Sequence, residues 1–128
     1  MPGIDPGLRI MPLYTTGSLS ASITVQFGPF TNSMTIRRFI EGCSANASSG
    51  TTALNIDDAG TDGTGTTAIA DKSAAVVTVA GAATEANNVN AADGYRLAAG
   101  SCLKVAITQA TAALTGYTIC AEVREGVG

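Results

Sequence analysis

Apolar residues near the C-terminal end of the chain recur at every second position, and this alternation constrains the fold more than any other feature. The alternating positions are Tyr95, Leu97, Leu103, Val105, Ile107, Tyr117, Ile119, Ala121 and Val123. Successive side chains on a strand point to opposite faces, so each run has one apolar and one mostly polar face. The pattern predicts an antiparallel sheet that is packed on one side only. We expect these residues to be buried together: Leu103, Val105, Ile107, Ile119 and Val123.

A turn is expected at residues 98–101, between the first two of these runs. Gly100 can adopt the positive φ that a tight hairpin requires. The runs on either side of it, 95–97 and 103–107, are therefore predicted to form a hairpin.

Two further strands precede this region. Residues 23–27 alternate cleanly and stop at Gly28-Pro29, a strong break. In the next strand, residues 34–43, Phe39 lies on the face opposite to Met34 and Ile36. This strand is either covered on both sides or carries a β-bulge.

The middle of the chain contains shorter segments. Short strands are expected at 54–56, from residue 69 and at 74–80, with a long turn at 57–65 and a polar connection with room for one helical turn at 81–92. The total of about eight strands at turn spacings of roughly 8–12 residues predicts an all-β antiparallel sandwich. A jelly roll and an immunoglobulin-like sandwich both fit, but the absence of tryptophan weakens the second.

The N-terminal segment differs from the rest of the chain. Residues 1–19 contain Pro2, Pro6 and Pro12, which favour an extended arm over a regular central strand. We therefore divide the chain into an arm, 1–19, and a β-sandwich domain, 20–128. Within the arm, residues 8–14 are too apolar to remain in water, so they pack either along their own domain or on a neighbouring subunit.

The composition limits the possible partners. Only 13% of the residues are charged, against roughly 25% in a typical soluble domain, which favours a surface covered in part by other subunits. The net charge of −3 argues against nucleic acid binding. No apolar run approaches the ~18 residues of a membrane helix, and the N-terminus does not resemble a signal peptide. We expect synthesis in a reducing cytosol.

The three cysteines do not have the spacing of a zinc site. Cys102 and Cys120 could be neighbours across a strand pair, where a bridge is conceivable, but free, half-buried thiols are expected for both and for Cys43.

Catalytic and metal-binding patterns are lacking. The chain contains no histidine, so neither a Ser–His nor a Cys–His pair can be assembled. Asp57, Asp58 and Asp62 could be read as calcium ligands, but Asp-Gly pairs are ordinary turn formers and the spacing is not that of an EF-hand. We expect no enzyme activity, no cofactor and no metal.

One segment carries a resemblance. Residues 93–105, Asp-Gly-Tyr-Arg-Leu-Ala-Ala-Gly-Ser-Cys-Leu-Lys-Val, resemble the Leu-x-Ala-Gly-Asp-x-Leu-x-Val hairpin of small jelly-roll proteins in tailed-phage virions. These include head decoration (cement) proteins and head-fibre domains. Ser101 replaces the usual aspartate, and the likeness covers mainly residues 50–125.

The resemblance implies a structural virion protein on the outer surface of the head. It would bind across neighbouring major capsid subunits. Independently of the resemblance, the largely uncharged surface predicts self-association as a trimer or dimer. The candidate capsid or inter-subunit contacts are in the arm: Leu8, Arg9, Ile10, Met11, Leu13 and Tyr14. The alternative is a fibre or adhesin domain that binds a receptor on the host surface.

Overall fold

A computed structural model describes residues 8–19, 21–43, 45–46, 51–75, 83–91, 93–110 and 114–125. Every regular element in these ranges is a β-strand. The ten strands are β1 (Leu8–Leu19), β2 (Ile23–Phe27), β3 (Met34–Cys43), β4 (Ala45–Asn46), β5 (Thr51–Gly60), β6 (Thr67–Ala75), β7 (Ala83–Asn88), β8 (Tyr95–Leu97), β9 (Cys102–Ala110) and β10 (Leu114–Glu125). None of the described segments forms a helix with the length and apolarity that a membrane span needs.

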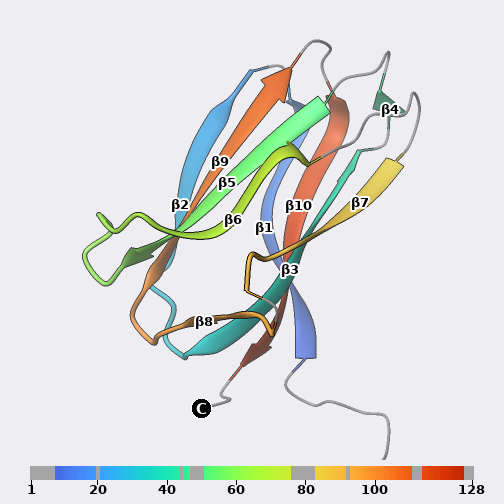
Figure 1. The fold of residues 1–128 in the computed structure, drawn as a ribbon. Helices are drawn as coiled ribbons and strands as arrows, with labels where there is room; N and C mark the ends of the chain where they lie inside the picture. The colour runs from blue at the N-terminus through green and yellow to red at the C-terminus, as the bar shows by residue number, and fades with distance from the viewer. Residues whose placement is uncertain are drawn as a thin grey trace, which may run out of the picture.

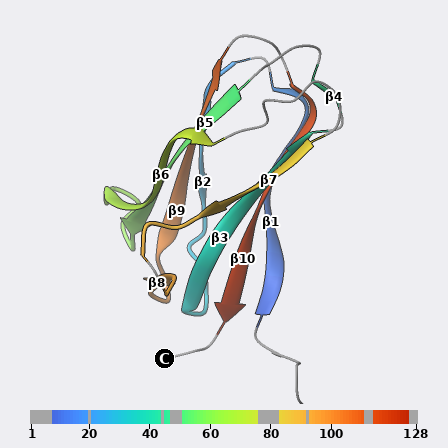
Figure 2. The same cartoon turned by 45° about the vertical axis from the view of Figure 1, so that its right-hand side comes forward.

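The strands form two antiparallel sheets, which Figures 1 and 2 show in two views turned by 45° from each other. Sheet A has the order β1-β10-β3-β7, with β8 also pairing with β3 and the short β4 with β10. Sheet B has the order β2-β9-β5-β6. The pairing is nested: β1 pairs with β10, β2 with β9, β3 with both β7 and β8, and β5 with β6. A long hairpin folded over into two sheets in this way is a jelly roll, so the predicted fold class is confirmed.

The inner faces of the two sheets form one core. The five residues predicted to lie there, Leu103, Val105, Ile107, Ile119 and Val123, are each at most 1% exposed and belong to a single apolar cluster. The alternation of the C-terminal strands therefore identified the correct face, because a sheet packed on one side buries every second side chain.

The β-bulge that Phe39 indicated lies at Arg37. Glu122 of β10 pairs with Arg38, but the next residue, Val123, pairs with Ile36, which leaves Arg37 as the extra residue. Beyond the bulge the inward positions shift by one, so Phe39 is fully buried and Ile40 is only partly buried.

The predicted hairpin at residues 98–101 is wrong, although the turn itself is present. The Ser101 N–H donates to the Ala98 carbonyl at 3.1 Å, and Gly100 has φ +86°. However, β8 pairs with β3 in sheet A, whereas β9 pairs with β2 and β5 in sheet B. The turn therefore carries the chain from sheet A to sheet B. The prediction failed because alternation shows which face of a strand is covered and does not show which strand lies next to it.

The polar connection expected at 81–92 also contains a strand. β7 pairs with β3 over six positions, from Arg38↔Asn88 to Cys43↔Ala83. Its sequence has low strand propensity, but the free edge of β3 supplies hydrogen-bond partners that override this preference. The strand expected at 74–80 lies largely outside the described residues, and β6 ends at Ala75.

Residues 8–19 belong to the sandwich and do not form a separate arm. β1 pairs with β10 from Leu8↔Arg124 to Leu19↔Leu114 and is the edge strand of sheet A. Two placements were considered for the apolar residues 8–14, along their own domain or on a neighbouring subunit. In the structure they lie along their own domain. Proline disfavours a central strand but is tolerated on an edge, which is where Pro12 lies.

A polar pair lies inside the sandwich. The Tyr117 hydroxyl of β10 donates to Glu41 Oε1 of β3 at 2.6 Å, and both residues are fully buried. Burial, and then the charge of the Glu41 carboxylate, raise the pKa of Tyr117 far above its usual range. Because Phe39 and Glu41 have the same parity, the bulge that turns Phe39 inward also turns Glu41 inward.

Candidate functional site

The residues predicted to make contacts on β1 differ in their exposure. Ile10 is 52% and Leu8 39% exposed, and Arg9 is also exposed. Met11 is 7% exposed and belongs to the core, while Leu13 and Tyr14 are partly buried and pack against the core. Leu8, Arg9 and Ile10 therefore lie exposed on β1, whereas Met11 and most of Leu13 and Tyr14 pack into the fold.

The edge of β1 is interrupted in its middle. Pro12 has no N–H to offer a new strand, and the register of β1 against β10 shifts between Pro12 and Tyr14. Prolines and bulges are ordinary protections of sheet edges against pairing with another chain. The middle of this edge is therefore protected against pairing with a strand of another chain.

An apolar strip lies on the outer face of sheet A beside these residues. Pro12 is paired with Cys120, which is paired in turn with Ile40, and paired residues share a face. Pro12 is exposed, and Cys120 and Ile40 are partly exposed. We define the docking face by Leu8, Ile10, Pro12, Ile40 and Cys120.

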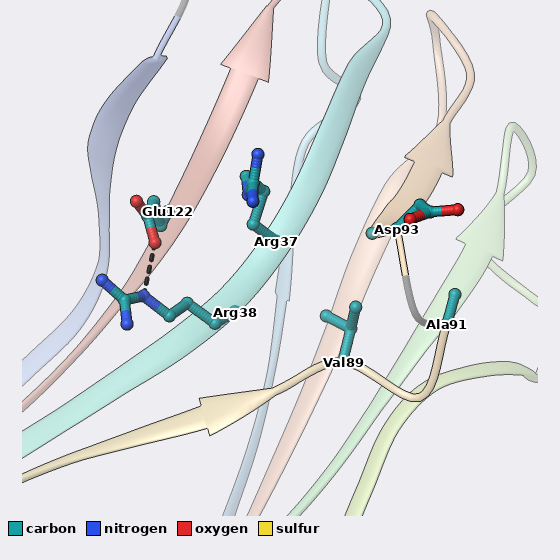
Figure 3. Close-up of a pocket in the computed structure, with 7 residues that line it drawn as sticks. Arg37, Arg38, Val89, Ala91, Asp93 and Glu122 are labelled. Atoms are coloured by element: carbon teal, nitrogen blue, oxygen red, sulfur yellow. Dashed lines mark hydrogen bonds and ion pairs between the residues drawn. The ribbon is translucent and has the colours of Figure 1, made fainter. Parts of the chain in front are cut away.

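A polar pocket of about 510 Å³ adjoins the docking face. We call it the arginine pocket; it is lined by Arg37, Arg38, Val89, Ala91, Asp93, Gly94 and Glu122. It is contiguous with the docking face because Ile10, Glu122 and Arg38 occupy one register row across three strands. Figure 3 shows Arg37 between Glu122 of β10 and Asp93, with Val89 and Ala91 on the chain that follows β7.

The pocket arises where two strands share one edge of β3. β7 pairs with β3 as far as Arg38, and β8 resumes the pairing at Ile36. The chain between them leaves the edge, and the Asn90 N–H donates to the Ile69 carbonyl of β6 at 2.9 Å. It returns at Gly94, where φ is +95° and a Cβ would lie 2.8 Å from Thr35 Cγ2. Only glycine fits this return without strain.

The charges in the pocket are only partly paired. Arg38 forms an ion pair with Glu122, in which the Arg38 Nε donates to Glu122 Oε2. Within the described residues, neither the Arg37 guanidinium nor the Asp93 carboxylate has a hydrogen-bond or ion-pair partner. In the view of Figure 3 the Asp93 carboxylate points away from Arg37. The pocket thus presents one unpaired cation and one unpaired anion to a ligand.

In a regular strand the consecutive residues Arg37 and Arg38 would lie on opposite faces. Both arginines line the same pocket because Arg37 is the extra residue of the bulge. Asp93, Val89 and Gly94 were not identified as site residues. The position of Phe39 indicated the bulge, but nothing in the sequence showed which side chains would line the pocket beside that bulge.

Two of the three aspartates considered as calcium ligands, Asp58 and Asp62, make ordinary turn contacts. Asp58 Oδ1 accepts a hydrogen bond from the Gly60 N–H at 2.9 Å, and Asp62 Oδ1 accepts one from the Thr64 N–H at 3.0 Å. Within the part of the chain that the structure describes, no three His, Cys, Asp or Glu side chains are grouped as metal ligands. The Asx-type contacts match the ordinary turn role of Asp-Gly sequences.

The cysteines are free thiols in separate places. Cys102 is paired with Gly60 in sheet B, whereas Cys120 is paired with Ile40 in sheet A, so they are not cross-strand neighbours. Cys43 and Cys102 are buried and Cys120 is partly exposed.

One hydrogen bond between the sheets has a tyrosine hydroxyl as its donor, so we expect the free energy of unfolding to fall at alkaline pH. The Tyr95 hydroxyl of β8 donates to Asp58 Oδ2 of β5 at 2.7 Å. Burial, and then the hydrogen bond to Asp58, raise the pKa of Tyr95 to about 12. Between pH 10 and 12 an unfolded chain releases this proton while the folded chain keeps it, so stability is complete below pH 10 and falls toward pH 12.

We therefore expect a lower urea midpoint at pH 11 than at pH 9, and a smaller difference in Tyr95→Phe. Equal differences in the wild type and the variant would show that Tyr95 does not contribute. The difference in phenolate absorbance between the wild type and Tyr95→Phe gives the titration of Tyr95 in the folded protein.

Comparisons with known proteins give structural likenesses only. No family model matches the chain, and no curated protein sequence matches it. A xylan-binding domain from CBM 22 is 14% identical, with a TM-score of 0.42, over 97% of this chain and 90% of that chain. An infectious bursal disease virus structure (Gt strain) is 15% identical, with a TM-score of 0.44, over 98% of this chain and 38% of that chain. The T=1 particles derived from this virus give 15% identity and a TM-score of 0.43, over 100% of this chain and 41% of that chain. The assignment of the jelly roll rests on the strand order and not on these likenesses.

Proposed function

We propose that the protein is a structural virion protein that decorates the outer surface of a tailed-phage head. In this role it binds across neighbouring major capsid subunits through the docking face. The observation that carries the proposal is the exposure of Leu8 and Ile10 beside Pro12, Ile40 and Cys120 on the outer face of sheet A. The resemblance of the sequence of residues 93–105 to a motif of decoration proteins supports it, although β8 and β9 do not pair as a hairpin.

The proposed mechanism is mass action and not catalysis. A ligand that binds only the assembled shell stabilises it by RT ln(1 + [L]/Kd), which is about 2.7 kcal/mol at a hundredfold excess over Kd. A sandwich whose edge resists strand addition suits this role, because it binds one flat partner without polymerising. The proposal includes no enzyme activity, no cofactor and no nucleic acid or membrane partner.

Variants of two adjacent residues of β1, Ile10 and Met11, allow an effect on docking to be distinguished from an effect on folding. We expect Ile10→Glu to weaken binding to empty, expanded heads of the same phage at least tenfold, because it places a charge in an apolar contact. Its free energy of unfolding should fall by no more than about 1 kcal/mol, since Ile10 is about half exposed and the new carboxylate faces only Glu122 across the strand pair. Met11→Ala is the matched control: it should lower the free energy of unfolding by about 2 kcal/mol or more.

Co-sedimentation with the heads measures binding, and urea titration measures stability. Undiminished binding of Ile10→Glu would contradict the docking face, and no binding of the wild type would contradict the decoration role.

Self-association as a dimer or trimer is part of the proposal, and sedimentation velocity at tens of micromolar tests it. The alternative role, a fibre or adhesin domain that binds a host surface, is favoured by one feature, the arginine pocket.

A further inference from the structure

The bulge that shapes the arginine pocket serves no evident need of the sheet. On either side of Arg37 the inward and outward positions of β3 alternate regularly, with Ile36 inward before it and Phe39 inward after Arg38. Without Arg37 the alternation would continue uninterrupted through the whole strand. Bulges are frequent where a side chain is re-aimed toward a functional site, and here the bulge aims two consecutive arginines into one pocket.

The two arginines have different roles there. Arg38 is occupied by its ion pair with Glu122, whereas Arg37 has no partner among the described residues. A guanidinium offers a planar fork of donors that matches the two oxygens of a carboxylate. Arg37 is therefore the group that would bind an acidic ligand.

Asp93 restricts the ligand further. Its ionised carboxylate only accepts hydrogen bonds, so it favours hydroxyl or other donor groups and repels a small inorganic anion. Val89 and Ala91 add a short aliphatic surface next to it. The volume of about 510 Å³ falls within the range of about 300–1,000 Å³ of small-molecule pockets and far exceeds the size of a single carboxylate.

We propose that the arginine pocket binds a sugar acid, with the ligand carboxylate on Arg37 and ligand hydroxyls donating to Asp93. The sugar acid is either free or the end of a glycan, since both present the same groups. The inference rests on the pocket alone and does not depend on the docking of the β1 face to a capsid.

The test is a titration of the ¹⁵N-labelled protein followed by NMR, with glucuronate as the probe. We expect saturable shifts of the amides of residues 36–38 and 89–94, with glucose and inorganic phosphate each binding at least tenfold more weakly. A tetrasaccharide that ends in glucuronate distinguishes the sources: tighter binding than the monomer assigns a glycan, and equal or weaker binding assigns the free acid. Absence of saturable shifts with both sugar acids, or phosphate binding as tight as glucuronate, would overturn the proposal.

Two variants separate the roles of the charged groups. Arg37→Ala should reduce glucuronate affinity at least tenfold and leave glucose binding unchanged. Asp93→Asn should reduce the preference for glucuronate over phosphate at least fivefold, a change that a purely structural role of Asp93 would not cause. Arg96→Ala is the matched control, since Arg96 is an exposed arginine on β8 that donates to Ser33 Oγ at 3.0 Å outside the pocket.

Circular dichroism and the urea midpoint show that each variant is folded. Arg37 is exposed, so its replacement is expected to leave both unchanged. Equal losses in Arg37→Ala and Arg96→Ala would assign the binding to general charge and would overturn the proposal.

Discussion

Replacing Phe39 with alanine is expected to lower the free energy of unfolding by about 3–5 kcal/mol, the usual cost of removing a buried aromatic side chain. Phe39 is fully buried in the cluster that joins the two sheets. Ile40 is the matched control because it is the next residue and is only partly buried on the outer face. We expect Ile40→Ala to cost less than about 1 kcal/mol, since little apolar area returns to water.

The comparison also tests the bulge. If Arg37 were paired regularly and not bulged, Ile40 would share the inner face with Met34 and Ile36, and Phe39 would lie outside. Urea titrations of both variants at pH 7 give the two free energies. A larger loss in Ile40→Ala than in Phe39→Ala would contradict the register, and with it the position of the arginine pocket.

Removing the hydroxyl of Tyr117 is expected to lower the free energy of unfolding by about 1.5–3 kcal/mol, the contribution of a hydrogen bond to a charged group. In Tyr117→Phe the ring still fills its site, but the Glu41 carboxylate loses a donor at 2.6 Å inside the sandwich. Water cannot replace that donor, because both residues are fully buried.

A double-mutant cycle isolates this pair from the other contacts of Glu41. Tyr117→Phe, Glu41→Gln and the double variant should give a coupling free energy of about 1 kcal/mol or more. Thr118→Ala, at the next position on the outer face, is a control that should couple with Glu41→Gln by less than about 0.5 kcal/mol. A coupling near zero for Tyr117 would mean that the buried hydrogen bond does not contribute to stability.

The pair also joins β3 to β10 at a point where register matters. Ile119 is paired with Glu41, and the bulge follows between Glu122 and Val123. A buried polar contact can specify one register over a slipped alternative, in which Tyr117 and Glu41 would no longer meet.

The docking face was partly predictable. The apolar content of residues 8–14 marked the segment as a contact region, but alternation is disturbed there by Pro12 and by the bulge after it. Which of Ile10 and Met11 faces outward depends on the pairing with Glu122 and Ala121 of β10, more than a hundred positions further along the chain. No local pattern contains that information.

The sequence by itself determined the strands whose side chains alternate, such as β2, β3 and β9, and the turn at Gly100. It also indicated the bulge near Phe39. These features depend on neighbouring residues, because the side-chain period of a strand and the φ of a glycine are local properties. The tertiary structure alone decided that β8 pairs with β3 and not with β9, that β1 and β7 complete sheet A, and that Arg37 and Asp93 face one pocket. In a jelly roll nearly every strand pairs with one that is distant in sequence, and those pairings are selected by how the whole core packs and not by any single segment.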